Sequence, residues 1–179
     1  MKPEIRSKFI QYLNHKESDE GFTLIELLAV IVIIGILATI AIPNFLNQDV
    51  KAKQSESKQN ITLINKAQNS YRAENTTFAA SFDVLAIGSI GGGTTGSTVN
   101  YSYTIAGATE TATVFSNPID KALKGHSGGV TRYNNAASQS VIGTVICEAN
   151  SNGTAASLPL MTSTSSAPTC TSDTNRLSL

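Results

Sequence analysis

One acidic side chain, Glu26, lies just inside the start of a long apolar segment, and residues 27–46 that follow it carry no charge. A carboxylate in hydrocarbon costs free energy and usually has a partner. Near the start of a helix, the helix dipole also stabilises a carboxylate. Glu26 is therefore either a simple helix-terminal charge or one half of an ionic contact with another group.

Two cysteines, Cys147 and Cys170, lie far downstream in the polar part of the chain. Their spacing matches neither a zinc site nor a CxxC redox pair. If the apolar segment crosses a membrane, both cysteines can share an oxidising compartment. A disulfide would close a loop of about 24 residues and contribute roughly 3 kcal/mol in the chain-entropy model. Two unpaired thiols are the alternative, but we expect the disulfide because a free thiol has little reason to lie in a polar tail.

The titratable residues form no pattern for catalysis or metal binding. Downstream of residue 21 the one histidine is His126, which we expect in an exposed loop because glycines surround it. Asp83, Asp120 and Asp173 are scattered along the chain, so no carboxylate pair or calcium site can be assembled from them. The sequence therefore predicts no enzyme, no metal and no cofactor.

The charges give no reason to expect nucleic acid or nucleotides as partners. The formal net charge is zero. Lys121, Lys124 and Arg132 form at most a small basic group, which is more typical of a solvated face. The glycine-rich segment 88–97 lacks the lysine of a phosphate-binding loop, and we expect a flexible loop there.

Residues 27–46 are long enough to cross a membrane. Twenty helical residues extend about 30 Å, which matches one hydrocarbon core. A soluble domain of this size seldom surrounds such a helix on every side. The segment is longer than the apolar part of a secretory signal, and no A-x-A cleavage pattern follows it. Basic residues on both sides leave the orientation open.

The stretch GFTLIELLAVIVIIGILATIAIPNF resembles the N-terminal signature of type IV pilins. The match covers residues 21–28 and continues with Gly35 and Pro43 at the family's spacing. The later blocks NYSYTI and VIGTVICEAN resemble the cyanobacterial proteins grouped as the type IV pilin-like G/H family.

The resemblance implies a processing step and an assembly contact. A prepilin peptidase would remove a cytoplasmic leader, residues 1–21, by cutting between Gly21 and Phe22, and would methylate the new amine of Phe22. Glu26, with Thr23 beside it, would set the axial register of subunits by reaching the amine of Phe22 on a neighbouring molecule. Between packed helices that attraction would exceed its value at a surface.

Gly35 and Pro43 weaken the helix that contains them. Proline has no N–H for the carbonyl of Thr39, and glycine adds backbone freedom. Such residues are common in membrane helices, but we interpret them as a hinge that lets the helix bend or stretch on packing.

The remaining periodicities predict a pilin-like α+β fold. Residues 22–46 form a transmembrane and assembly helix, and residues 47–75 continue it as an amphipathic helix on a head domain. The head, residues 76–150, is predicted to hold a small antiparallel sheet of about four strands, because the connections are short. Residues 151–179 are rich in serine and threonine, which indicates a loop or tail.

The strands are expected where apolar and polar residues alternate. The most apolar of them is expected at the centre of the sheet. The candidates are 99–105, 111–116, 129–133 and, as the central strand, 141–147.

The predicted function is that of a structural subunit of a type IV pilus. Its partners would be the prepilin peptidase, other pilin subunits, the pilus assembly platform of the inner membrane and membrane lipid. The precursor would be a single-pass protein of the inner membrane, and the assembled form an extracellular pilus or a periplasmic pseudopilus. The alternatives are a pseudopilin of a type II secretion system and an anchored binding module that never polymerises.

Overall fold

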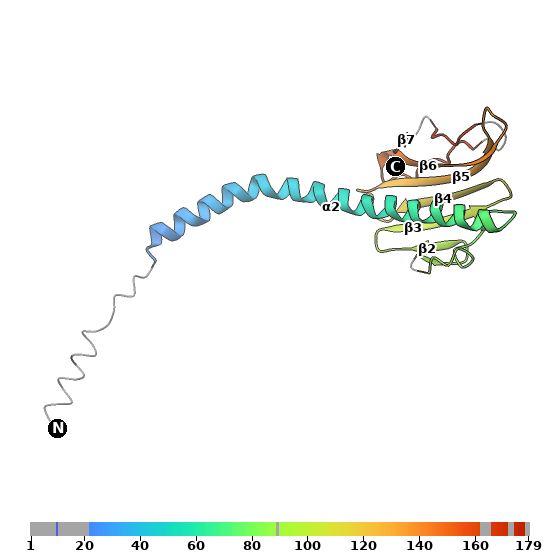
Figure 1. Ribbon diagram of the computed structural model, residues 1–179. Helices are drawn as coiled ribbons and strands as arrows, with labels where there is room; N and C mark the ends of the chain where they lie inside the picture. Colours follow the sequence, from blue (N-terminus) through green and yellow to red (C-terminus); the bar gives the residue numbers. More distant parts are fainter. Residues whose placement is uncertain (1–9, 11–21, 89, 162–165, 172–173, 178–179) are drawn as a thin grey trace, which may run out of the picture. The chain divides into compact units, whose positions relative to one another are not determined.

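The computed structural model describes residue 10 and residues 22–88, 90–161, 166–171 and 174–177. Its one long helix, α2 (Leu24–Glu74), has 51 residues and is followed along the chain by an antiparallel sheet (Figure 1). The chain divides into two compact units, Met1–Phe45 and Leu46–Leu179. The second unit holds the later part of α2 together with the whole sheet, and we call it the head.

The sheet is a meander of seven strands, each antiparallel to its neighbours and in chain order from β1 to β7. The strands are β1 (Gly91–Gly92), β2 (Thr95–Ser97), β3 (Tyr101–Gly107), β4 (Thr111–Pro118), β5 (Lys124–Asn134), β6 (Ser140–Asn152) and β7 (Thr174–Arg176). The prediction of an α+β fold with an antiparallel sheet is confirmed. The predicted number of about four strands was too low, because β1 and β2 lie in the expected flexible loop and β7 lies in the expected tail.

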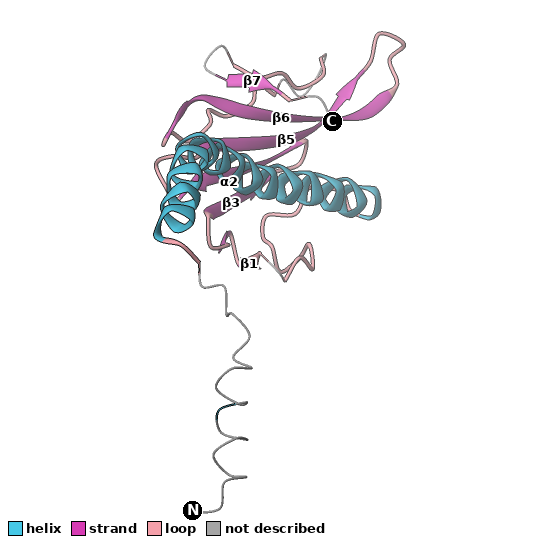
Figure 2. Cartoon of the chain, turned by 90° about the vertical axis from the view of Figure 1, so that its left-hand side faces the viewer, coloured by secondary structure: helices cyan, strands magenta, loops and turns pink. Residues whose placement is uncertain are grey.

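The later part of α2 lies across one face of the sheet, over β3, β5 and β6 (Figure 2). The apolar side chains of this layer are fully or almost fully buried. From the helix they include Ile61 and Ile64, and from the rest of the head Phe82, Tyr101, Tyr103, Ile105, Val114, Leu123 and Ile146. Burial of this apolar surface is the main force that holds the helix on the sheet.

Strand β5 is buried on both faces, and its glycines explain how. A Cβ added to Gly128 would lie 2.4 Å from Cγ2 of Ile61 on α2. A Cβ added to Gly129 would lie 2.8 Å from Sδ of Met161, in the segment that follows β6. Glycine therefore lets the helix pack closely on one face and the C-terminal segment on the other.

The predicted order of the sheet needs correction. β4 is the central strand, whereas β6, which was expected there, lies next to the edge strand β7. The apolar character of β6 comes from its contact with the helix and with the C-terminal segment, and a single sequence pattern does not distinguish that burial from a central position.

Two buried amide side chains of α2 form hydrogen bonds with the rest of the head. Gln68 donates to the carbonyl of Ala79 (2.8 Å) and accepts from its backbone N–H (2.9 Å). Asn65 donates to the carbonyl of Val145 on β6 at 3.3 Å. Both amide side chains thus have a hydrogen-bond partner, so the segment after α2 and strand β6 are placed by directional bonds as well as by apolar packing.

Candidate functional site

Helix α2 begins with a capping box made by Thr23 and Glu26. Oε2 of Glu26 accepts hydrogen bonds from the backbone N–H and from the hydroxyl of Thr23, each at 2.9 Å. The hydroxyl oxygen of Thr23 accepts from the backbone N–H of Glu26 at 3.3 Å. Both bonds to the carboxylate go to the same oxygen, so Oε1 lies outside this pair and the local cap does not prevent a contact with a second molecule.

The helix that follows exposes apolar side chains all around its axis. Every large apolar side chain from Leu24 to Leu46 is exposed, from 49% at Val30 to 87% at Leu24. By length and composition this part of α2 can cross a membrane. An apolar surface on all sides is stable only when lipid or other helices cover it.

The remaining predicted positions of the N-terminal segment lie in or next to this helix. Phe22 lies two residues before the start of α2 and is 87% exposed. Gly21, the residue before the predicted cut, lies outside the described residues. A Cβ on Gly35 would have no neighbour within 4 Å, and α2 runs through Pro43 without ending. The roles of these residues in processing and bending stay predictions.

A compact group of charges joins α2 to the sheet at Glu148 on β6. Lys58 of α2 bonds Oε2 of this carboxylate at 2.8 Å, and Lys124 of β5 bonds Oε1 at 3.0 Å. Burial alone raises the pKa of Glu148, but the hydrogen bonds from the two lysines outweigh burial and leave the pKa below its ordinary value of 4.5. The group therefore acts as an ionic link between three elements.

His126 lies beside this group. The prediction that it lies in an exposed loop is wrong. It belongs to β5 and its side chain is fully buried. Nε2 is 3.6 Å from Oε2 of Glu148, and neither ring nitrogen has a hydrogen-bond partner. Burial, helped by the positive charge of Lys58 and opposed by Glu148, lowers the pKa of His126 from 6.5 to about 4. At neutral pH the ring is uncharged and packs as a core side chain.

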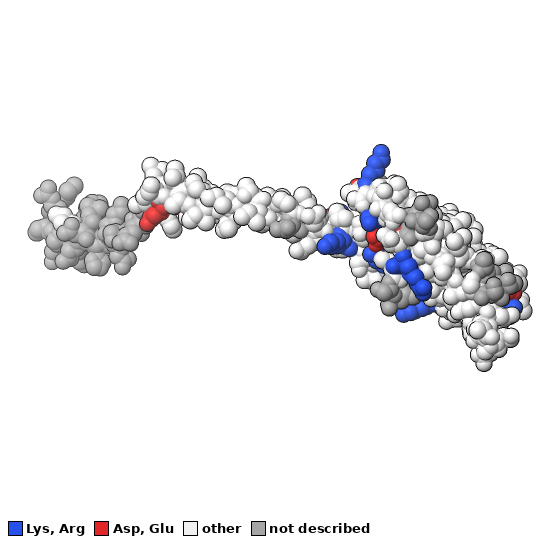
Figure 3. All heavy atoms as spheres, turned by 90° about the horizontal axis from the view of Figure 1, so that it is seen from above, with Lys and Arg blue, Asp and Glu red and all other residues white. Residues whose placement is uncertain are grey.

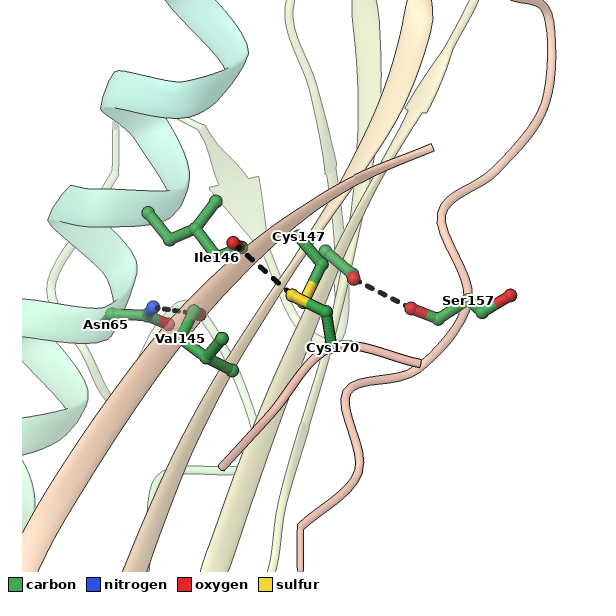
Figure 4. Close-up of a disulfide and its surroundings, with 7 residues drawn as sticks. Asn65, Val145, Ile146, Cys147, Ser157 and Cys170 are labelled. Carbon is green, nitrogen blue, oxygen red and sulfur yellow. Dashed lines mark hydrogen bonds between the residues drawn. A yellow bond between two sulfur atoms is a disulfide. The ribbon is translucent and has the colours of Figure 1, made fainter. Parts of the chain in front are cut away.

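The two cysteines form the disulfide that the sequence predicted, between Cys147 on β6 and Cys170 in the segment before β7 (Figure 4). Sγ of Cys170 lies 3.7 Å from the carbonyl oxygen of Ile146. Ser127 of β5 donates to the carbonyl of Ser157 at 2.8 Å, which holds the start of the same segment. The disulfide and this bond fasten the C-terminal segment over the face of the sheet opposite α2.

Removing the disulfide should destabilise the head. In a Cys147→Ala/Cys170→Ala variant we expect a loss of about 3 kcal/mol and a melting temperature lower by on the order of 10 °C, because the unfolded chain regains the entropy of an open loop. Near-ultraviolet circular dichroism of the full chain in detergent measures this through the buried tyrosines. The wild-type chain under reducing conditions is the matched control, and an unchanged melting temperature in both samples would contradict the structural role.

The part of the chain that the structure describes contains no group of side chains suited to hold a metal ion. Within residues 22–88, 90–161, 166–171 and 174–177, no three side chains of His, Cys, Asp and Glu gather as potential metal ligands. Of the basic residues Lys121, Lys124 and Arg132, two form ion pairs within the head. Lys124 pairs with Glu148, and Arg132 pairs with Glu110 at 2.6 Å.

A capped, wholly apolar helix start, continued by a helix that packs on an antiparallel sheet, defines a pilin-like protein. The comparisons agree. The family model described as "Type IV pilin-like G and H" matches residues 54–171, and the chain belongs to this family. A model described as "Prokaryotic N-terminal methylation motif" matches residues 18–42.

Curated relatives come from two kinds of assembly. The chain is 49% identical over 61 residues to the "Type IV major pilin protein PilA" of Myxococcus xanthus, a match to 34% of this chain and 28% of that protein. It is 36% identical over 63 residues to the "Type II secretion system core protein G" of Aeromonas hydrophila, which covers 35% and 44%, and 36% over 59 residues to that of Escherichia coli, which covers 33% and 41%. The matches thus span less than half of each relative. No solved structure matches the chain significantly.

Proposed function

We propose that this chain is the precursor of a structural, non-enzymatic subunit of a type IV pilus. The observation that carries the proposal is the methylation motif at residues 18–42, which includes the start of a helix with apolar side chains on every side. Before assembly, lipid covers this surface and the protein is a single-pass protein of the inner membrane. In the filament, the corresponding helices of other subunits cover it.

Processing and assembly act on the start of the helix. The prepilin peptidase cuts between Gly21 and Phe22 and methylates Phe22, and the assembly platform of the inner membrane then receives the subunit. Oε2 of Glu26 holds Thr23 of its own chain, and Oε1 is available to the cationic amine of Phe22 on a neighbour. Such a contact is strong only where the surroundings exclude water, so it specifies the register between packed helices.

A pseudopilin of a type II secretion system is the second candidate, because several of the matched relatives are core proteins G of such systems. The two candidates share cleavage and polymerisation and differ in location. Mass spectrometry of the N-terminus from fibres sheared off the cell surface separates them. A pilus subunit would begin at methylated Phe22 in that fraction, whereas a pseudopilin would be cut but absent from it. An uncut chain would favour an anchored module that does not polymerise.

Gly21→Asp should block the cut completely. We expect the variant to accumulate in the membrane as a precursor that keeps residues 1–21, because a charged side chain replaces hydrogen at the bond that the peptidase must bind. Immunoblots of cells with the peptidase measure the size of the product. Gly21→Ala, the smallest change at this position, is the control and should still be cut. Normal processing of the aspartate variant would contradict the proposed site.

A further inference from the structure

A groove of about 520 Å³ lies on the head where α2, β6 and the residue after β7 meet. Its apolar surface comes from Leu63 on α2, Ile146 on β6 and Leu177, which directly follows β7. The N–H of Leu177 donates to the carbonyl of Ile146 at 2.9 Å, which fixes the side of the groove opposite the helix. Leu63 is 47% exposed, so packing within the head does not explain an apolar side chain at this position.

Both charged side chains that the structure describes in this lining, Lys58 and Lys66, are basic. Lys58 shares its charge with Glu148 at 2.8 Å. Lys66 is exposed and forms no ion pair with any residue that the structure describes. Figure 3 views the head from the side of β7 and shows mostly basic atoms among the charged ones there. The groove therefore suits an apolar group that lies next to a negative charge.

The turn at residues 82–86 carries such a pair of groups. Two of its apolar side chains are buried in the core, whereas Asp83 and Val84 face solvent, with Val84 49% exposed. Oδ2 of Asp83 accepts from the N–H of Gly93, the residue after β1, at 2.7 Å, which holds the turn beside this strand. Asp83 is the only charged residue in the segment 75–109, so no charge close to it in the chain neutralises it.

The groove and this turn lie at opposite edges of the head. Strands β1 and β7 are the two edges of the sheet, six strand spacings or about 29 Å apart. Figure 2 shows them on opposite sides of α2. A chain therefore cannot place its turn in its own groove, but it can offer the turn to another copy. A contact between two different surfaces is heterologous, and it can be repeated from one copy to the next.

We propose that the turn at residues 82–86 docks in the groove of a second copy of this chain. Val84 of one copy packs on Leu63 of the other. The carboxylate of Asp83 then lies beside Lys66. The inference rests on the proposed function, because it names a contact between the heads of neighbouring subunits.

The size of this contact determines what it can do. A stable interface between free proteins buries about 1,200–2,000 Å², far more than one valine and one carboxylate provide. The docking of the turn therefore orients two heads that the apolar helices have already brought together, and it does not hold free heads in a dimer.

Crosslinking between two differently tagged full-length chains, each with its native disulfide, tests this contact. One chain carries Gln59→Cys, at an exposed position of the groove lining, and the other carries Val84→Cys. A short bismaleimide, which joins only free thiols, is applied to intact cells and to sheared fibres. In the matched control, Ala136→Cys on the exposed β5–β6 turn replaces Val84→Cys.

We expect the crosslink between positions 59 and 84 to be several times more abundant than the one between 59 and 136. Lys66→Glu in the chain with the groove cysteine should lower the yield about fivefold, because it replaces an attraction by a repulsion. Asp83→Asn, which keeps an oxygen for Gly93, should lower it in the same direction. Lys51→Glu, the same charge change at an exposed position of α2 outside the groove, should not lower it.

Equal crosslinking of position 59 to positions 84 and 136, in fibres that contain both chains, would overturn the docking and leave the proposed function intact. The crosslink between 59 and 84 in cells whose surface fibres lack the chain would support the docking and overturn the role in a pilus. Absence of both the crosslink and the chain from fibres would overturn both. A crosslink between two copies of the same variant would show a symmetric contact and overturn the heterologous one.

Discussion

Replacing Glu26 with leucine should leave the protein inserted and cut but reduce its incorporation into filaments by about tenfold or more, since an amine of Phe22 buried without a partner costs several kcal/mol. Leucine is favourable in the hydrocarbon of the membrane, so the membrane precursor should accumulate normally. The measurement compares the amount of subunit in sheared fibres with the amount of processed subunit in the membrane. Normal filaments from this variant would refute a register role for the carboxylate.

The capping box makes a sharper comparison possible. Glu26→Gln keeps an oxygen that can accept from Thr23, because glutamine also serves in a capping box, but it removes the charge. Thr23→Ala keeps the charge and removes the hydroxyl that caps the helix. If the charge sets the register, the glutamine variant assembles as poorly as the leucine variant and the alanine variant assembles well. The reverse pattern would show that the cap matters and the ionic contact does not.

Acidification from pH 6.5 to pH 4 should destabilise the head by about 3 kcal/mol through His126 alone, given about 1.4 kcal/mol for each unit of pKa difference. Its pKa is 6.5 in an ordinary environment and about 4 in the folded head. The unfolded chain therefore binds the proton first, and stability is lost as the pH falls through this window. The groups that face the ring are Glu148 from β6, Lys58 from α2, Lys124 from β5 and the tyrosine ring of Tyr101 from β3, centred 6.0 Å away.

Glu148 extends the acid sensitivity to lower pH. Because its folded pKa lies below 4.5, its contribution is present above that value and is lost as the pH falls through the folded pKa. Protonation removes the charge that holds Lys58 and Lys124, so the link between α2 and the sheet weakens. We expect the head to unfold in acid while the apolar part of the helix stays in detergent or lipid.

Denaturant unfolding of the full chain at several pH values, followed by the near-ultraviolet signal of the head, measures this loss. His126→Leu is the matched control, since both ring nitrogens lack hydrogen bonds and an apolar side chain of similar size forfeits none. The leucine variant should be about as stable as wild type at pH 7 and should keep its stability down to about pH 4.5. An equal loss in both proteins would show that another group titrates.

The apolar start of α2 can be predicted from the sequence because it depends on residues that are close together in the chain. The run of twenty uncharged residues at 27–46 makes this part of α2 apolar on every side. That property does not depend on contacts with the head. The capping box needs only Thr23 and Glu26 three residues apart, although the helix-terminal charge predicted from the sequence did not include the hydrogen bonds with Thr23. The disulfide could also be predicted from the sequence, because a chain with two cysteines has one intramolecular pairing.

The head required the tertiary structure because long-range contacts decide burial there. Nothing near Gly128 and Gly129 shows that a helix covers one and a C-terminal segment the other, so a strand was expected only at residues 129–133, whereas β5 extends from Lys124 to Asn134. His126 looked exposed because its neighbours are glycines, whereas Glu148 and Lys58, far away in the chain, enclose it. A local pattern reports which backbone forms a residue favours, but only the packed head shows which distant side chains exclude water from it.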